Sequence, residues 1–250
     1  MEVATVGSGR ICRGCWDQMK MPIPIRGPLS LPFRALGITQ SKMNPNICTI
    51  CERSFAYVKK QRRISAEATI LFADIRGYTS LSARLDSALL AKIVEVFHDQ
   101  CGQAIWAQDG IVNKQMGDGL MAIFNFPIKS ERHASAAVAA GIDMQRRFHA
   151  ALADLSPRVS ESEAIGFGVG IHSGQVEIGE FSTYRSDFTA IGGAVNLTAR
   201  LESQAAAGEI LVSPEAASEA RELMADAAVR TFALKGIDRP VRAFVLTASP

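Results

Sequence analysis

The sequence predicts an α+β fold in which a mixed β-sheet is built on a split βαβ unit, preceded by a small cysteine-rich module. Two observations lead to this prediction. From about residue 66, strand-like and helix-like segments follow each other in the order β-α-β-β-α-β. Before that point the 250-residue chain is basic and rich in proline, and it contains four of the five cysteines. We therefore expect residues 1–63 to form the module with a linker helix, and residues 64–250 to form the larger domain.

The composition is typical of a folded protein, with 48% apolar and 21% charged residues. Residues 1–63 contain 11 basic and 3 acidic side chains, whereas residues 64–250 contain 16 basic and 22 acidic ones. No apolar run approaches the roughly 18 residues that cross a bilayer, and the first residues lack the apolar stretch of a signal peptide. These features argue against a membrane-spanning or secreted protein, and we expect a cytoplasmic one.

The first part of the chain has few signs of regular structure. In residues 21–32 the prolines at positions 22, 24, 28 and 32 are too closely spaced for a helix, so we expect an extended loop or an edge strand there. Residues 52–63 contain neither glycine nor proline and fit a short basic helix. A segment of about 60 residues rarely folds through its own core alone, so we expect a metal ion, a disulfide or a partner to stabilise it.

In the larger domain, apolar runs and helical periodicity place the elements in order. Strands are expected at residues 68–73, 111–116, 120–124, 165–171, 175–181, 209–212, 232–234 and 242–246. Helices are expected at residues 90–105, 144–155 and 194–203. Two tight turns, Gly117-Asp118-Gly119 and His172-Ser173-Gly174, are expected to join pairs of strands. The pattern therefore predicts a mixed sheet with helices packed on one face.

Two carboxylates lie at strand ends that this fold brings together. Asp74 ends the first strand, directly before a glycine-containing turn whose N–H groups can face an anion. Asp118 lies at the tip of the hairpin formed by the next two strands. Two carboxylates beside phosphate oxygens are typical of a Mg²⁺ site for phosphoryl or nucleotidyl transfer. Taken singly, each residue is also explained by a role in a turn or at a strand end.

Four segments, in order and at matching spacings, resemble the catalytic domain of class III adenylyl/guanylyl cyclases. They are residues 70–81 (ILFADIRGYTSL), 113–119 (NKQMGDG), 168–174 (GVGIHSG) and 187–201 (DFTAIGGAVNLTARL). The resemblance covers roughly residues 66–248 and implies a ferredoxin-like class III nucleotide cyclase domain. It also implies two Mg²⁺ or Mn²⁺ ions in each active site, and attack of the ribose 3′-OH of a nucleoside triphosphate on its α-phosphorus.

The resemblance assigns a role to each matching residue. The metal-binding positions match Asp74, Asp118 and the carbonyl of Ile75. The positions that contact the triphosphate match Gly77, Tyr78, Thr79 and, at the terminal phosphate, Lys235. The positions that contact the base match Lys114 and Thr189, and those that contact the ribose and the transferring phosphate match Asn196 and Arg200.

Lys114 and Thr189 indicate ATP as the substrate, because guanylyl cyclases typically have Glu and Cys at these two positions. Asn196 and Arg200 are four residues apart on an expected helix, so both lie on one face. Arginine suits a charge that is spread over phosphate oxygens. Without the surrounding motif, an ordinary solvated helix face would also explain these two residues.

The two Cys-x-x-Cys motifs, Cys12–Cys15 and Cys48–Cys51, offer four thiolates to one tetrahedral ion. The 32 residues between them exceed the usual spacing of a zinc ribbon. We expect a structural Zn²⁺, with an iron–sulfur cluster or redox-active thiols as alternatives. The basic charge nearby would permit peripheral contact with an acidic membrane or with nucleic acid. Because aromatic residues are not interleaved with the basic ones, we expect no specific nucleic-acid binding. We expect the module either to regulate the larger domain or to support its dimer. Cys101 is expected to be a buried apolar residue.

These observations predict an adenylate cyclase, a phosphorus–oxygen lyase that converts ATP to 3′,5′-cyclic AMP and pyrophosphate for signal transduction. In the family that it resembles, one domain supplies the two Asp residues of each active site and a second supplies the base-contacting, Asn and Arg residues. This chain contains all of them once, so we expect a homodimer with two composite sites. The alternatives are a cyclase that uses GTP, a dinucleotide cyclase or polymerase on a similar sheet, and a non-catalytic nucleotide-binding sensor.

Overall fold

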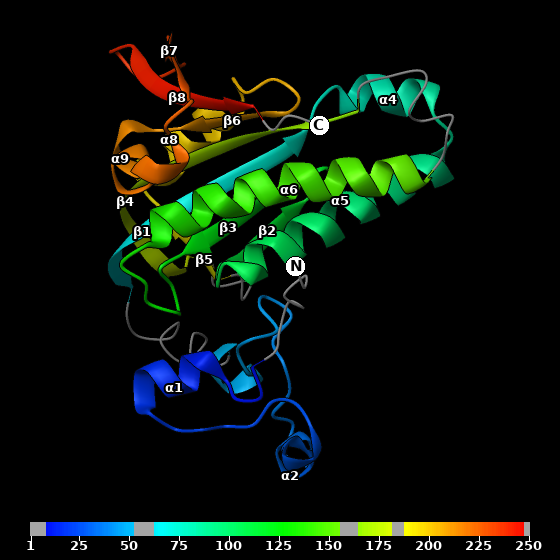
Figure 1. Cartoon of the computed structure of the whole chain (residues 1–250), viewed down its shortest axis with the longest axis vertical. Helices are drawn as coiled ribbons and strands as arrows, with labels where there is room; N and C mark the ends of the chain where they lie inside the picture. Colours follow the sequence, from blue (N-terminus) through cyan, green and yellow to red (C-terminus); the bar gives the residue numbers. More distant parts are fainter. Residues whose placement is uncertain (1–8, 53–62, 156–164, 182–187, 248–250) are drawn as a thin grey trace.

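The structure, a computed structural model, describes residues 9–52, 63–155, 165–181 and 188–247. In these residues eight strands form one mixed sheet (Figure 1). The strands are β1 (Ile64–Ile75), β2 (Ile111–Met116), β3 (Gly119–Phe124), β4 (Phe167–Glu180), β5 (Phe188–Ile191), β6 (Glu209–Val212), β7 (Ala228–Phe232) and β8 (Val241–Thr247). They lie in the order β2-β3-β1-β4-β6-β8-β7, with β5 paired to β4. The expected α+β fold on a split βαβ unit is confirmed.

The helices in this part of the chain are α1 (Arg13–Met19), η1 (Pro28–Ser30), α2 (Leu31–Ala35), α4 (Tyr78–Arg84), α5 (Ser87–Ala107), α6 (His133–Leu155), α8 (Gly193–Glu202), α9 (Pro214–Glu219) and η2 (Arg221–Leu223). The two longest, α5 and α6, lie side by side across one face of the sheet (Figure 1). Leu71 of β1, Phe97 of α5 and Phe148 of α6 are buried in the apolar cluster between these layers. None of the described helices combines the length and the apolar character that crossing a membrane requires.

Side chains of β1 alternate between the two faces of the sheet. Leu71 contributes to the cluster under α5 and α6, whereas Ile70 contributes to a second cluster on the opposite face. α8 packs directly over β4 on this second face, because a Cβ on Gly170 would lie 2.6 Å from the carbonyl oxygen of Thr198. The expected covering of one face by helices thus holds for α5 and α6, while α8 lies on the other face.

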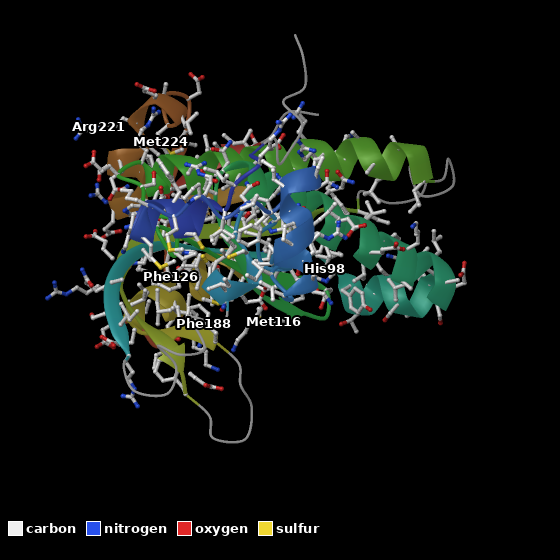
Figure 2. All side chains as sticks on the ribbon, turned by 90° about the horizontal axis from the view of Figure 1, so that it is seen from below. His98, Met116, Phe126, Phe188, Arg221 and Met224 are labelled. Atoms are coloured by element: carbon white, nitrogen blue, oxygen red, sulfur yellow. The ribbon has the colours of Figure 1, made fainter. Side chains whose placement is uncertain are left out.

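The N-terminal segment also packs against the second face. Its Ile25 and Ile47 are buried in the same apolar cluster as Ile70 and Ile123 of the sheet. Figure 1 shows the segment below the sheet, and Figure 2 views the molecule from that side. Prolines 28 and 32 lie in the first turns of η1 and α2, where proline is tolerated. The basic helix expected at residues 52–63 lies almost wholly outside the described residues.

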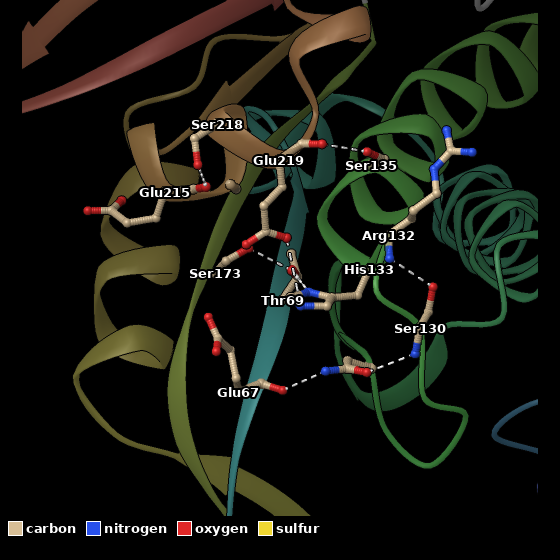
Figure 3. Close-up of polar contacts among 12 residues, drawn as sticks. Glu67, Thr69, Ser130, Arg132, His133, Ser135, Ser173, Glu215, Ser218 and Glu219 are labelled. Atoms are coloured by element: carbon tan, nitrogen blue, oxygen red, sulfur yellow. Dashed lines mark hydrogen bonds and ion pairs between the residues drawn. The ribbon is translucent and has the colours of Figure 1, made fainter.

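The second expected hairpin is wrong, because β4 runs unbroken through its turn and pairs with β1 along most of its length. The hydroxyl of Ser173 lies 2.7 Å from that of Thr69, which in turn lies 2.6 Å from Nδ1 of His133 at the start of α6 (Figure 3). Gly174 serves close packing rather than a turn, since a Cβ there would lie 3.3 Å from the Cβ of Ala194 in α8. Internal polar contacts and helix packing therefore explain residues whose types are typical of turns.

Candidate active site

Two carboxylates meet where β1 ends and β3 begins. The antiparallel pairing places Asp74 opposite Gly119, so the tight turn before β3 brings Asp118 beside Asp74. The N–H of Ile75 donates to the carbonyl oxygen of Asp118 at 3.1 Å, which holds this turn against the strand. A Cβ at residue 119 would lie only 2.7 Å from Oδ1 of Asp74, so the close approach requires glycine.

The charges at this point are not balanced by the protein alone. Burial raises the pKa of Asp74 and the negative charge of Asp118 raises it further, while Arg76 opposes both. Nη1 of Arg76 lies 3.8 Å from Oδ2 of Asp74, which is too far for a hydrogen bond. Two neighbouring carboxylates beside the backbone of Ile75 are a donor set that suits a hard divalent cation. The three residues expected to bind Mg²⁺ or Mn²⁺ are therefore close together.

The turn that follows β1 carries the residues expected to contact the triphosphate. Gly77 has a φ of +68°, a left-handed conformation that favours glycine, and it directly precedes α4. The first N–H groups of a helix, here those of Tyr78 and Thr79, have no acceptor within the helix. They are therefore available to an anion, at the end of the strand that carries Asp74.

Sequence reasoning missed an ion pair beside this turn. Nη2 of Arg76 lies 2.6 Å from Oε1 of Glu202 and also donates to the carbonyl oxygen of the same residue, at the end of α8. Gly168 of β4 makes room for this arrangement, since a Cβ there would lie 2.2 Å from Nη2. Burial raises the pKa of Glu202, and Arg76 opposes this effect, whereas Asp74 and Asp118 add to it. Arg76 lies within one of the four cyclase-like segments and Glu202 directly follows another, so their positions in the sequence could have indicated the pair.

A second residue that the sequence did not indicate is His98 of α5. Its Nε2–H donates to the carbonyl oxygen of Gly117 at 2.8 Å, in the turn that carries Asp118. α5 thereby supports the tip of the hairpin. A histidine in an amphipathic helix carried no signal in the sequence, because its partner is 19 residues away.

The two residues expected to contact the base lie next to a β-bulge. The register of β2 against β3 shifts between Val112 and Lys114, so Asn113 bulges from the ladder. The Nδ2–H of Asn113 donates to the carbonyl oxygen of Phe188 at 2.8 Å, and the hydroxyl of Thr189 donates to Oδ1 of Asn113 at 3.2 Å. Asn113 thus joins β2 to β5 and brings Lys114 and Thr189 to neighbouring positions.

α8 presents Asn196 and Arg200 to the outside of the chain. The two exposed residues are four apart, as expected, and the buried face of the helix contains Thr198. Among the described residues, no contact joins either of them to Asp74 or Asp118. Within the described part of one chain, these two groups of expected site residues are therefore not in direct contact.

Lys235 lies in an exposed turn after β7. The strand expected at residues 232–234 lies earlier, because Leu234 begins this turn: the N–H of Ile237 donates to its carbonyl oxygen at 3.1 Å, and Gly236 has a φ of +80°. No contact between described residues joins Lys235 to the other expected site residues.

The four cysteines of the Cys-x-x-Cys motifs form one buried cluster. The Sγ–Sγ distances are 3.5 Å for Cys12–Cys51 and for Cys15–Cys48, 3.4 Å for Cys15–Cys51 and 3.9 Å for Cys48–Cys51. All four sulfur atoms lie within 4.8 Å of one another, and none forms a disulfide. The two motifs are therefore assembled as expected. Cys101 lies elsewhere, in α5, where burial raises the pKa of its thiol well above the usual value.

A split βαβ sheet with paired carboxylates at the junction of β1 and β3, and a glycine turn beside them, is an arrangement suited to a nucleotide cyclase or nucleotidyl-transfer domain. The chain belongs to the adenylate and guanylate cyclase catalytic domain family, whose family model matches residues 60–248. The expected resemblance to class III cyclases is thereby confirmed for this part of the chain.

Similar proteins include cyclases of both base specificities. The chain is 31% identical over 162 residues to an adenylate cyclase of Anabaena cylindrica, which covers 64% of this chain and 31% of that protein. It is 30% identical over 138 residues to adenylate cyclase 1 of Rhizobium meliloti, which covers 54% of this chain and 20% of that protein. The chain therefore spans about a third or less of the length of these relatives.

Two solved structures have a similar fold. The adenylyl cyclase CyaB from P. aeruginosa has a TM-score of 0.67 at 30% identity, covering 76% of this chain and 98% of that one. The guanylyl cyclase Cya2 has a TM-score of 0.66 at 29% identity, covering 74% of this chain and 93% of that one. Because one is an adenylyl and the other a guanylyl cyclase, the base specificity of this chain has to be argued from its own residues.

Proposed function

We propose that the protein is a cytoplasmic adenylate cyclase that converts ATP to 3′,5′-cyclic AMP and pyrophosphate, with residues 64–250 as its catalytic unit. The observation that carries this proposal is the hydrogen bond from the hydroxyl of Thr189 to Asn113. With its proton used in this bond, the hydroxyl can only accept from a base, as the amino group of adenine requires. Lys114 can only donate, as N1 of adenine requires, whereas guanine has a hydrogen at N1, so that two donors would face each other at this atom.

The reaction centre lies around the carboxylate pair. Asp74 and Asp118, with the carbonyl of Ile75, would hold two Mg²⁺ or Mn²⁺ ions, which when bound acidify the ribose 3′-hydroxyl and neutralise the triphosphate. The N–H groups of residues 77–79 would hold the triphosphate, and Lys235 its terminal phosphate. The 3′-hydroxyl loses its proton to water as its oxygen bonds to the α-phosphorus, and the bond from the α-phosphorus to the oxygen that bridges to the β-phosphorus breaks, so pyrophosphate leaves.

The remaining catalytic groups come from a second chain. Asn196 would orient the ribose, and Arg200 would stabilise the charge on the transferring phosphate. Both are exposed on α8, and no described contact joins them to the carboxylates of their own chain. We infer a two-fold homodimer in which each active site takes its carboxylates from one chain and its base-contacting, Asn and Arg residues from the other.

The test is product analysis with purified protein, ATP or GTP, and Mg²⁺ or Mn²⁺, with the nucleotides separated by chromatography. We expect cyclic AMP from ATP to form far faster than cyclic GMP from GTP. An Asp118→Ala variant prepared in parallel should form neither, which excludes a contaminating cyclase. Cyclic GMP as the main product would make the protein a guanylate cyclase, and nucleotide binding without any product would make it a non-catalytic sensor.

A further inference from the structure

We propose that Cys12, Cys15, Cys48 and Cys51 bind one Zn²⁺ ion, and that this ion holds a loop that positions the base-contacting edge of the cyclase domain. A tetrahedral ion with Zn–S bonds of about 2.3 Å separates its sulfur ligands by about 3.8 Å. The Sγ–Sγ separations in the structure, between 3.4 and 3.9 Å for four of the pairs, are close to this value. An iron–sulfur cluster fits less well, because its four thiolates are divided among two or more iron atoms, whereas here all four sulfur atoms lie within 4.8 Å of one another.

The surroundings of the sulfur atoms suit thiolates. The N–H groups of Cys15 and Cys48 donate to Sγ of Cys12 at 3.4 and 3.1 Å, and such hydrogen bonds stabilise an anionic sulfur. Gly14 leaves space for the cluster, since a Cβ there would lie 2.9 Å from Sγ of Cys51. All four cysteines are at most 2% exposed. Ligand number, donor groups and space therefore agree on a site for one ion.

The loop that precedes the second cysteine motif forms hydrogen bonds with the end of α5, the start of β2 and the residues between them. The carbonyl oxygen of Met43 accepts the indole N–H of Trp106 at 2.7 Å and the backbone N–H of Val112 at 3.1 Å. Asn44 is fully buried, and its amide donates to the carbonyl oxygen of Gly110 at 2.8 Å. Because this loop leads directly into two of the four sulfur ligands, a bound ion fixes it in place.

The first cysteine motif reaches the same corner of the domain. Arg13 forms an ion pair with Asp109, just before β2. Val112, which the loop holds, is followed by the bulged Asn113, whose side chain joins β2 to β5. Phe188 of β5 lies in the same apolar cluster as the four cysteines. A continuous set of contacts thus runs from the sulfur cluster to the bulge.

The bulge sets the relative position of Lys114 and Thr189. Without the ion the loop is released, β2 loses the acceptor for Val112, and the base-contacting pair is held less firmly. The ion therefore affects nucleotide binding by positioning Lys114 and Thr189, without contacting the nucleotide itself. This effect on the substrate rests on the proposed function, whereas zinc binding and the hold on β2 do not.

Metal content of the full-length chain tests the site. We expect about one zinc ion per chain by elemental analysis in the wild type, and almost none in a Cys12→Ser, Cys48→Ser double variant. Cys101→Ala is the matched control, because it removes a buried cysteine outside the cluster. Gly14→Ala keeps all four thiols but crowds the cluster, so this variant should lose its zinc at a lower chelator concentration than the wild type does. Iron in place of zinc, or protein that stays metal-free when zinc is supplied, would overturn the assignment.

Hydrogen exchange and kinetics test the hold on β2. In chelator-treated wild-type protein the amide of Val112 should exchange faster, and added zinc should restore its protection. The KM for ATP should rise by about tenfold, the cost of one misplaced hydrogen bond, while kcat and the Mn²⁺ concentration for half activation stay nearly constant. If removal of zinc leaves the exchange rate of the Val112 amide unchanged, the ion does not fix β2 through this loop. If it leaves the KM for ATP unchanged, the ion does not affect the base-contacting edge.

These readouts separate the inference from the proposed function. If the wild-type protein forms no cyclic nucleotide at all, the proposed function fails and the effect on the substrate falls with it. Metal content and the exchange of Val112 still decide whether the zinc site and its hold on β2 exist.

Discussion

Two inactive variants should restore each other if every active site is shared by two chains. On the proposed function, Asp118→Ala would remove a metal-binding carboxylate and Arg200→Ala the charge that stabilises the transferring phosphate, so each homodimer should lose at least about 100-fold in activity. In a mixed dimer both lesions fall in one site, and the other site keeps its carboxylates and its arginine. Random pairing makes about half of the dimers mixed, and each has one of two sites intact, so an equal mixture should recover about a quarter of the wild-type activity.

The assay is co-expression of the two variants with different affinity tags, followed by sequential purification of the mixed dimers. Purified mixed dimers should then have about half of the wild-type activity per dimer. The single variants, purified in the same way, must be inactive for the comparison to count. If verified mixed dimers are as inactive as either parent, the carboxylates and Arg200 do not come from different chains, and the exposed position of Arg200 on α8 has another explanation.

Three further outcomes follow from single contacts. Lys114→Glu combined with Thr189→Cys should lower ATP turnover far more than GTP turnover, because donors and acceptors at the purine edge are exchanged; an unchanged preference would remove both residues from the base pocket. Arg76→Met should lower the free energy of unfolding in urea by about 1–3 kcal/mol, because the buried carboxylate of Glu202 would remain beside Asp74 and Asp118 without its cation, and equal stability would show that the pair is dispensable. Burial lowers the pKa of His172 in the folded protein below its usual 6.5. As the pH drops below 6.5, the imidazole is therefore protonated more readily in the unfolded chain than in the folded one, and the free energy of unfolding should fall. His172→Gln should flatten this slope, and an identical slope in the variant would contradict the assignment.

The sequence predicted those parts of the fold that depend on local patterns. Helical spacing between residues 90 and 105 located the core of α5, and Asp118 between two glycines located the turn that meets β1. The two Cys-x-x-Cys motifs also came together, because a two-residue gap lets both thiols of a motif face one point. In each case a spacing of a few residues carried the information.

The parts that escaped prediction depend on contacts between distant residues. Ser173 and Gly174 are typical of a turn, yet a hydroxyl partner on β1 and a helix packed overhead keep them in a strand. His98 and Arg76 looked like ordinary polar residues, because their partners lie 19 and 126 residues away. The packing of the cysteine motifs on the second face of the sheet likewise has no signal in their spacing. Residue type alone therefore does not identify such contacts.

The bare backbone of Gly170 has a consequence for how such an enzyme can be switched. Because Gly170 has no side chain, the backbone of α8 packs directly against the backbone of β4. A Cβ at residue 170 would also lie 2.4 Å from the backbone nitrogen of Glu202. The backbone of α8 at Thr198 and Glu202 is therefore held close to β4, and the helix carries Asn196 and Arg200 with it. In the proposed homodimer, a rotation of one protomer against the other would therefore shift this helix as a unit relative to the partner's carboxylates.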